Sequence, residues 1–599
     1  MNQPKLFVCL RDYNRSDFTH DLTAGITVGM VALPLAMAFA IASGVKPEAG
    51  IYTAVIAGFI ISALGGSRVQ IGGPTGAFVV IIYSVTQQFG PGGLIVCTML
   101  AGVILFVMGV VRFGAVIKFI PHPVSVGFTT GIAVLILGTQ VKDFFGLETG
   151  ALPASFAPKM QALAAAWATW NAPTLALAIG SVALIALWPR RLAKVFPGSA
   201  AALVAGALVV ALSGWGAHMG IATIGSQFGG LARAFPAMAW PVVDWSQLPH
   251  LFQPAMTIAL LIAMQALLCA VVTDGIVDDR HDSNQELMAQ GIANFVAPLF
   301  GCIPATGAVA RSISNVRGGA STPVAGMIHA LALLLLIMLV APLMKHVPLA
   351  CLSAVLVVAA YKMADWRQFM RLGKWPSSDA AVFLLTFALT VLVNLTVAVE
   401  VGIVLAALLF MNRISETTQI MAVDESTETE GSQHSLIGKE IPEGVLIFRV
   451  FGAFFFGAAD KLETELNRAK QEPKVLILRM RKVLAMDATG LNALEDLQEK
   501  LQRQGAHLLL SGPHTQPYMM MEQAGFMDQL GRENVCPHIG AALDRAREIL
   551  GLPPAPPSDP LHAQKKELEA ARLEITNALE RANRVLQTPA NRGDGPRSS

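Results

Sequence analysis

The chain has 599 residues, of which 54% are hydrophobic and only 14% are charged, and its formal net charge at pH 7 is +2. Soluble domains are about one quarter charged, so this composition predicts a membrane protein, and the near-neutral charge gives no reason to expect a nucleic-acid partner. The six cysteines form no CxxC pair and no metal-ligand spacing, so we expect no disulfide framework, metal or other cofactor. P-loop, nucleophile-elbow and catalytic-triad motifs are absent from the sequence, which disfavours ATP-driven transport and an enzyme.

Residues 1–20 mix basic and acidic side chains and lack the order of a cleaved signal, so we expect them to form a cytoplasmic segment. Beyond them, apolar runs recur at or near the length of roughly 20 residues that a helix needs to cross a bilayer. We expect a polytopic α-helical membrane domain over residues 21–415, with fourteen segments at 25–44, 50–64, 75–88, 93–111, 123–141, 173–189, 199–214, 254–275, 286–300, 306–317, 324–342, 347–361, 379–396 and 398–412. The third and tenth segments are too short to cross.

Basic residues in the short loops predict the orientation of these segments. With the N-terminus inside, twelve lysines and arginines fall in the cytoplasmic loops and five in the outer loops, as the positive-inside rule requires. We therefore expect a multi-pass protein of the cell inner membrane with both termini in the cytoplasm.

Two helix-breaking stretches occupy corresponding places in the two halves of this domain. Residues 72–77 read Gly-Gly-Pro-Thr-Gly-Ala and open the third segment, and residues 304–308 read Pro-Ala-Thr-Gly-Ala and open the tenth. Seven segments in each half would insert with opposite topology, which is the inverted repeat of many alternating-access transporters. The matched motifs favour this 7+7 arrangement.

An interrupted membrane helix is tolerated where its freed backbone groups face protein or a water-filled cavity. If the third and tenth segments begin near the midplane, their free N–H groups and positive dipole ends form an anion site. Thr75 and Thr306 would add hydroxyl groups, and Gly76 would let the anion approach the backbone. The structural alternative is that these small residues only permit close helix packing.

Three further side chains are candidates for this site. Phe39 follows Pro34, which we expect to disrupt the first segment, and could close over a substrate or simply pack. Gln265 is an amide in an apolar stretch, where it either binds substrate or joins two helices. Arg311 either serves an anion or is a snorkelling or ion-paired arginine near the inner face. The charged cluster at 274–286 is expected to be mostly a solvated cytoplasmic loop.

The composition changes after Arg413. We expect a linker at 416–440 and a small α/β domain at 441–551, with strands at 445–450, 475–479 and 507–511 and helices at 458–470, 488–504, 516–524 and 538–550. Residues 552–599 begin with a proline-rich linker, and 560–588 is expected to form a C-terminal amphipathic helix or a short coiled coil.

Several motifs resemble the sulfate permease (SulP) family, the bacterial relatives of solute-carrier family 26. They are found at residues 21–29, 72–75, 284–287 and 315–317, and the C-terminal domain is similar to STAS domains. Residues 32–36, 65–68, 140–144 and 267–271 look most like the DauA branch of four-carbon dicarboxylate transporters. The resemblance implies a core domain moving against a gate domain, a homodimer, and an anion held between the third and tenth half-helices. The family's site positions fall on Phe39, Thr75, Gly76, Gln265, Val309, Ala310 and Arg311.

The resemblance implies secondary transport of a small anion, with succinate, fumarate or aspartate preferred over bicarbonate or sulfate. An anion channel, or a membrane-anchored sensor with the STAS-like domain as its output, is the alternative. Leu35 and Gln265 stand where many relatives have polar or acidic residues, so coupling to H+ or Na+ through those positions is in doubt. Ala488 replaces the serine that is phosphorylated in related domains, and Asp487 is expected to cap the next helix. Relatives' domains imply acyl carrier protein as a partner.

Overall fold

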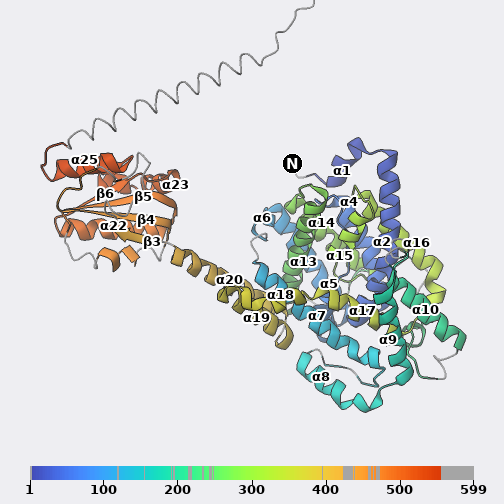
Figure 1. Cartoon of the computed structure of the whole chain (residues 1–599). Helices are drawn as coiled ribbons and strands as arrows, with labels where there is room; N and C mark the ends of the chain where they lie inside the picture. Colours follow the sequence, from blue (N-terminus) through green and yellow to red (C-terminus); the bar gives the residue numbers. More distant parts are fainter. Residues whose placement is uncertain are drawn as a thin grey trace, which may run out of the picture. The chain divides into compact units, whose positions relative to one another are not determined.

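The computed structural model describes residues 3–117, 121–150, 152–153, 155–189, 192, 196–213, 219–231, 235–241, 246, 248–393, 395–417, 419–422, 436, 439–455, 461–462, 464–466 and 473–554. The chain forms two compact units, Met1–Ala407 and Leu408–Ser599 (Figure 1). Each unit is described by itself.

The first unit is helical, and helices occur at each of the fourteen predicted segments. Its helices are α1 (Lys5–Cys9), α2 (Arg15–Ala42), α3 (Pro47–Tyr52), α4 (Gly58–Leu64), α5 (Val79–Val110), α6 (Gly114–Ile117), α7 (His122–Phe145), α8 (Phe156–Ala165), α9 (Ala172–Leu187), α10 (Gly198–Ser213), α12 (Ile224–Phe228), α13 (Leu248–Val277), α14 (Ser283–Val296), α15 (Val309–Arg317), α16 (Val324–Met344), α17 (Leu349–Met363), α18 (Trp366–Met370), α19 (Ser377–Leu392) and α20 (Leu395–Thr417), which runs into the second unit. Of these, α1, α6, α8, α12 and α18 are additional short helices outside the predicted segments.

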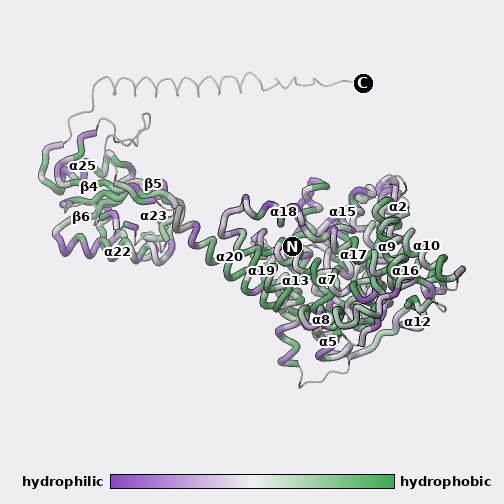
Figure 2. The backbone as a smooth tube through the Cα atoms, turned by 60° about the horizontal axis from the view of Figure 1, so that its bottom comes forward, coloured by the Kyte–Doolittle hydropathy of each residue, from purple (hydrophilic) through white to green (hydrophobic). Residues whose placement is uncertain are grey.

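Within the described residues, six helices are long and apolar enough to cross a membrane, and four shorter apolar helices accompany them. Figure 2 shows hydrophobic stretches along the helices of this unit. The number of fourteen crossings stays a prediction.

Three local features differ from the sequence expectation or refine it. The third and fourth segments are the two parts of α5, which meet at a kink where Gly90 has φ 70°. The tenth segment becomes helical only at Val309, because Thr306 and Gly307 form a strand. The break expected at Pro34 is wrong, since α2 continues through it as one helix; neighbouring helices commonly let a membrane helix accommodate a proline.

The helices pack in two sets. The first set contains α2 to α5 and α13 to α16, and the second contains α7, α9, α10, α17 and α19, with α2 touching α17 between them. Small residues allow close packing where apolar lipid gives helices no hydrophobic reason to associate. Gly102 of α5 and Gly291 of α14 face each other, and a Cβ atom on either would lie 2.6 Å from a backbone nitrogen of the other helix.

A two-stranded antiparallel ladder joins the two halves of the chain inside the first set. Strand β1 (Gly72–Gly73) pairs with β2 (Thr306–Gly307), so that Gly72 lies opposite Gly307 and Gly73 opposite Thr306. The ladder ends in a further bond from the Ala308 amide to the Ile71 carbonyl, at 2.9 Å. The matched sequence motifs therefore meet in space.

The charged cluster at 274–286 is not mainly a solvated loop. The Glu286 side chain is fully buried and accepts hydrogen bonds from the Gly66 amide (3.0 Å), Gln70 Nε2 (2.9 Å) and Gln290 Nε2 (2.8 Å). The His281 ring lies between Asp274 Oδ2 (2.6 Å) and Ser283 Oγ (2.9 Å). The Gly66 and Gln70 donors lie 220 and 216 residues from Glu286 in the sequence, so the local sequence pattern could not reveal these two contacts.

The second unit contains an α/β domain with a five-stranded sheet in the order β3-β4-β5-β6-β7. The strands are β3 (Gln419–Ala422), β4 (Val445–Phe454), β5 (Val475–Met486), β6 (His507–Ser511) and β7 (Val535–Cys536), and only β3 runs antiparallel to its neighbour. The helices are α22 (Ala488–Arg503), α23 (Thr515–Gln523), α24 (Phe526–Leu530) and α25 (Ile539–Ile549). The sheet is buried on both faces, with α22 and α25 in separate apolar clusters.

Most of the predicted elements of this domain are confirmed by the described residues. Asp487 caps α22 as expected, with its Oδ1 atom accepting from the Gly490 amide at 2.8 Å. Edge strands β3 and β7 were not expected, and β3 lies inside the segment assigned to the linker. The predicted helix at 458–470 is helical at the five residues described there. The predicted helix at 560–588 lies outside the described residues.

Candidate substrate-binding site

The β1–β2 ladder leads directly into the starts of two helices. After β1, Thr75 precedes the short 3-10 turn Gly76–Phe78 that leads into α5, and after β2, Ala308 precedes α15. Neither Thr75 nor Ala308 caps its helix with a side-chain hydrogen bond. The Phe78 amide already donates to the Thr75 carbonyl at 3.3 Å, so the Gly76 and Ala77 amides and the first amides of α15 are the ones that no side chain caps. Both positive dipole ends lie beside one ladder.

Thr75 and Gln265 lie at one edge of the region between the two helix starts. Thr75 Oγ1 lies 3.5 Å from Gln265 Oε1 of α13, which is at the long limit of a hydrogen bond. Both residues are partly exposed, whereas the ladder beside them is buried. This hydroxyl and amide are therefore joined by a weak hydrogen bond at most.

Phe39 of α2 lies against the start of the first half-helix. A Cβ atom on Gly76 would stand 3.1 Å from Phe39 Cε1 and 2.9 Å from Ile136 Cδ1 of α7. The missing side chain at Gly76 thus gives space to the phenyl ring. Phe39 is itself partly exposed, so its ring forms an apolar wall of the region between the two helix starts.

Arg311 crosses from the second half-helix to the first. Its side chain is buried, with 4% of the residue exposed, and its Nη2 group donates to the Pro74 carbonyl. The Nη1 group has no hydrogen-bond partner, and a Cβ atom on Gly73 would lie 2.8 Å from it. Among the described residues no carboxylate pairs with this guanidinium. The alternative of an ion-paired arginine is therefore not what the structure places here.

The remaining predicted residues lie on the second half-helix and its approach. Val309 is partly exposed and Ala310 is exposed, both in the first turn of α15. Thr306 is fully buried, and its hydroxyl group donates to the Ile262 carbonyl of α13 at 3.1 Å. The structure thus brings Thr75, Gly76, Val309, Ala310 and Arg311 around the ladder, while the Thr306 hydroxyl is engaged by α13.

Sequence analysis missed the polar side chains that hold the ladder in place. Asn294 of α14 binds Ala305 through both its Oδ1 (2.8 Å) and Nδ2 (2.9 Å) atoms, Ser312 Oγ accepts from the Ile71 amide (2.9 Å), and Asn315 donates to the Val69 carbonyl (3.0 Å). Each is a polar residue in a predicted membrane segment, which is a signal that could have found them. His329 of α16 is also buried, and neither of its ring nitrogens has a hydrogen-bond partner among the described residues.

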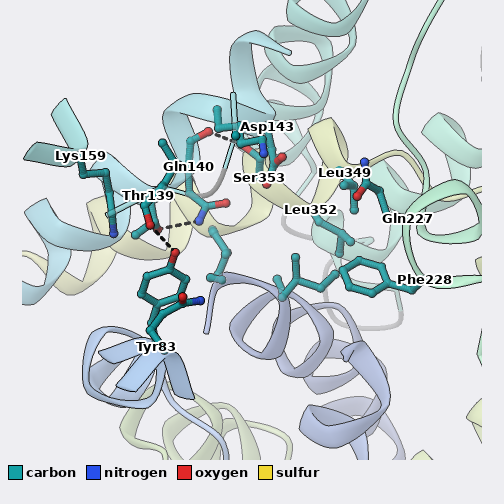
Figure 3. Close-up of a pocket in the computed structure, with 18 residues that line it drawn as sticks. Tyr83, Thr139, Gln140, Asp143, Lys159, Gln227, Phe228, Leu349, Leu352 and Ser353 are labelled. Carbon is teal, nitrogen blue, oxygen red and sulfur yellow. Dashed lines mark hydrogen bonds between the residues drawn. The ribbon is translucent and has the colours of Figure 1, made fainter. Parts of the chain in front are cut away.

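A cavity of about 290 Å³ lies between the two sets of helices (Figure 3). Its walls come from α2, α5, α7, α8, α12 and α17, and they include Ala38 and Ile41 on either side of Phe39 in the sequence. Its polar lining residues are Tyr83, Gln87, Thr139, Gln140, Lys142, Asp143, Lys159, Gln227 and Ser353. The cavity therefore adjoins α2 and α5, two of the helices that carry the candidate site.

Comparison with known proteins identifies the family of this chain. Residues 18–386 match the family described as "Sulfate permease family", and residues 437–542 match the STAS domain. The putative sulfate transporter YvdB of Bacillus subtilis is 39% identical over 529 residues, covering 88% of this chain and 98% of the relative. The bicarbonate transporter BicA of Picosynechococcus is 29% identical over 493 residues, covering 80% and 86%.

A solved structure shares the same fold. The overall structure of SLC26A9 superposes with a TM-score of 0.80 at 18% identity, covering 91% of this chain and 94% of that one. The helical unit and the α/β domain described above correspond to these two matched ranges. The chain belongs to the sulfate permease family, as a multi-pass membrane transporter with a C-terminal STAS domain, and is not an enzyme.

Proposed function

We propose that the protein is a secondary transporter of small anions that works by alternating access. The observation that carries this proposal is the pair of helix starts without a side-chain cap beside the β1–β2 ladder. The Arg311 cation is buried between them, and no carboxylate in the described part of the chain pairs with it. Amide groups, helix dipoles and a permanent cation all favour negative charge. Phe39, Thr75, Gly76, Gln265, Val309, Ala310 and Arg311 would contact the substrate, and Thr306 would hold the ladder behind it.

We infer four-carbon dicarboxylates such as succinate, fumarate and aspartate as the preferred substrates. This rests on the resemblance of residues 32–36, 65–68, 140–144 and 267–271 to the dicarboxylate branch. Bicarbonate and sulfate are the competing substrates, and they are supported by the names of BicA and YvdB. A channel would conduct without saturation, and a sensor would bind an anion without moving it.

The remaining proposals concern assembly and energy coupling. We place the protein in the inner membrane with both termini in the cytoplasm, as a homodimer whose STAS domain has acyl carrier protein as a candidate partner. Gln265 is a neutral amide, so it supplies no charge for H+ or Na+ binding. Coupling to either ion would have to use a different group, and exchange of one anion for another needs none.

The direct test is uptake into proteoliposomes that contain the purified full-length chain. Labelled succinate, bicarbonate and sulfate are supplied separately, under an imposed proton gradient, an imposed sodium gradient, or no gradient. We expect saturable succinate uptake that unlabelled succinate blocks. Equal, non-saturating passage of all three anions would contradict the transporter proposal and favour a channel.

A further inference from the structure

The cavity between the two helix sets contains a buried cation. Lys159 of α8 is only 6% exposed and lines the cavity. The Lys159 Nζ atom lies over the ring of Tyr83, 4.9 Å from the ring centroid. Among the described residues no carboxylate forms an ion pair with Lys159, which sets it apart from most buried lysines.

The position of the Lys159 ammonium group is fixed by its surroundings. The Tyr83 hydroxyl donates to the Leu152 carbonyl at 2.7 Å and so holds the ring under the ammonium group (Figure 3). An ammonium ion over an aromatic face is attracted to it, but the ring does not neutralise the charge. A buried charge without a counter-ion is costly. Burial accordingly lowers the pKa of Lys159.

The other lining groups leave the cavity with a positive balance. Lys142 also lines it, and its Nζ atom makes one long contact of 3.4 Å to the Thr149 carbonyl. Asp143 is the one acidic lining residue; it is attracted electrostatically to Lys142, but within the described part of the chain it lies within ion-pair distance of neither lysine. Gln140 and Thr139 add polar groups at the same wall, where Gln140 Nε2 donates to Thr139 Oγ1 at 2.9 Å. Two cations therefore face one carboxylate.

The cavity also lies where a transported anion would pass. Its walls combine α2 and α5 from the first helix set with α7 and α17 from the second. On α2, Ala38 and Ile41 line the cavity while the neighbouring Phe39 contacts Gly76 of the candidate site. In the predicted topology, Lys142 and Lys159 belong to the outer loops, so the cavity would face the periplasm.

We propose that this cavity is a second anion-binding site, in which Lys159 receives a small carboxylate or inorganic oxyanion before it reaches the paired half-helices. The proposal rests on the proposed function, because it assumes that an anion crosses between the two helix sets. The space is ample for a small anion that keeps part of its water shell, since one water needs only about 10–15 Å³ of such volume.

Equilibrium binding to the detergent-purified full-length chain tests this directly. Succinate, bicarbonate and sulfate are titrated in turn, and we expect two bound anions per chain for at least one of them. Lys159→Gln should lose one of the two, whereas Lys159→Arg should keep both because it retains the charge. Lys345→Gln is the matched control, since Lys345 is an exposed lysine of the same predicted face outside the cavity.

A second measurement does not depend on whether two different variants fold equally well, because it compares one protein before and after chemical modification. Lys159→Cys is treated in proteoliposomes with aminoethyl methanethiosulfonate, which restores a positive charge, or with sulfonatoethyl methanethiosulfonate, which adds a negative one. We expect the KM for uptake to fall with the first reagent and to rise by about tenfold with the second, which is typical of a lost or reversed charged contact. The wild type receives both reagents as a control for Cys9.

The outcomes separate this proposal from the proposed function. Wild-type binding of two anions without any uptake would overturn the transporter and leave the second site standing. Saturable uptake together with unchanged stoichiometry in Lys159→Gln, and unchanged KM after both reagents, would overturn the second site and leave the transporter standing.

Discussion

Arg311 on one half-helix donates a hydrogen bond to the carbonyl of Pro74, which precedes the other half-helix. The same side chain therefore braces the two motifs and supplies the charge of the candidate site. A substitution that shortens it would disturb both functions. The variants used to test the site therefore have to separate the bracing contact of Arg311 from its charge.

Arg311→Met removes the cation but keeps a long side chain in the buried space. We expect anion binding to weaken by roughly 100-fold, because a charged contact to the substrate is lost. Arg311→Lys keeps the charge and should recover part of the affinity. Isothermal titration with succinate measures this, and size-exclusion chromatography shows whether the variants fold. Equal affinity in Arg311→Met and wild type would leave Arg311 with a purely structural role.

Gly76→Ala tests the contact between the first half-helix and Phe39. The added methyl group would stand 2.9 Å from Ile136 Cδ1 and 3.1 Å from Phe39 Cε1, so one of these side chains or the helix start must move. We expect the KM for uptake to rise by about tenfold, as for a site displaced by a fraction of an ångström. Phe39→Leu in the same chain should recover part of the loss. Two independent, additive effects would argue against the contact.

Glu286→Gln tests the buried carboxylate behind the ladder. The carboxylate accepts three hydrogen bonds, and an amide would present a donor to at least one of the three N–H groups. We expect a loss of about 2 kcal/mol and a lower melting temperature in detergent. Glu400→Gln is the control, because Glu400 is exposed. A melting temperature equal to that of the control would show that Glu286 does not stabilise the fold.

The pH dependence of uptake should report Lys159. Because burial lowers its pKa, Lys159 loses its charge at a lower pH than an exposed lysine does. The KM should therefore be low while Lys159 is protonated and should rise as the pH increases through this lowered pKa. Tyr83, Lys142 and Asp143 are the other titratable groups at the cavity. Lys159→Arg should abolish the rise, because arginine stays charged; a rise that persists would assign it to one of those groups.

Sequence analysis located the elements of the site better than their environment. The lengths of the apolar runs predicted the helices, and two Thr-Gly-Ala motifs predicted the pairing that the ladder provides. The helix cap at Asp487 was also predicted correctly, because capping depends on the local sequence. Glu286 and Thr306 were different. Gln290 is a local donor to Glu286, but the other partners of the two residues, at Gly66, Gln70 and Ile262, are far away in the sequence and could not be predicted from it.

The cavity could not be predicted for the same reason. Lys159 and Tyr83 are far apart in the sequence, and the sequence alone presents Lys159 as an ordinary basic residue of an outer loop. In the folded chain it lies over the Tyr83 ring, and α8 packs against α7. The burial of Lys159 arises only in the folded chain, so it can be recognised only when the packing of several helices is known.

The β1–β2 ladder is made of backbone atoms, and three of its four residues are glycines. The frame that aligns the half-helices is therefore chemically separate from the rim that we propose contacts the substrate, formed by Thr75, Gln265 and the first turn of α15. Substitutions at the rim can change the size and charge of the accepted anion while the frame stays the same. One scaffold of this kind could thus diversify toward carboxylates, bicarbonate or sulfate through a few side chains.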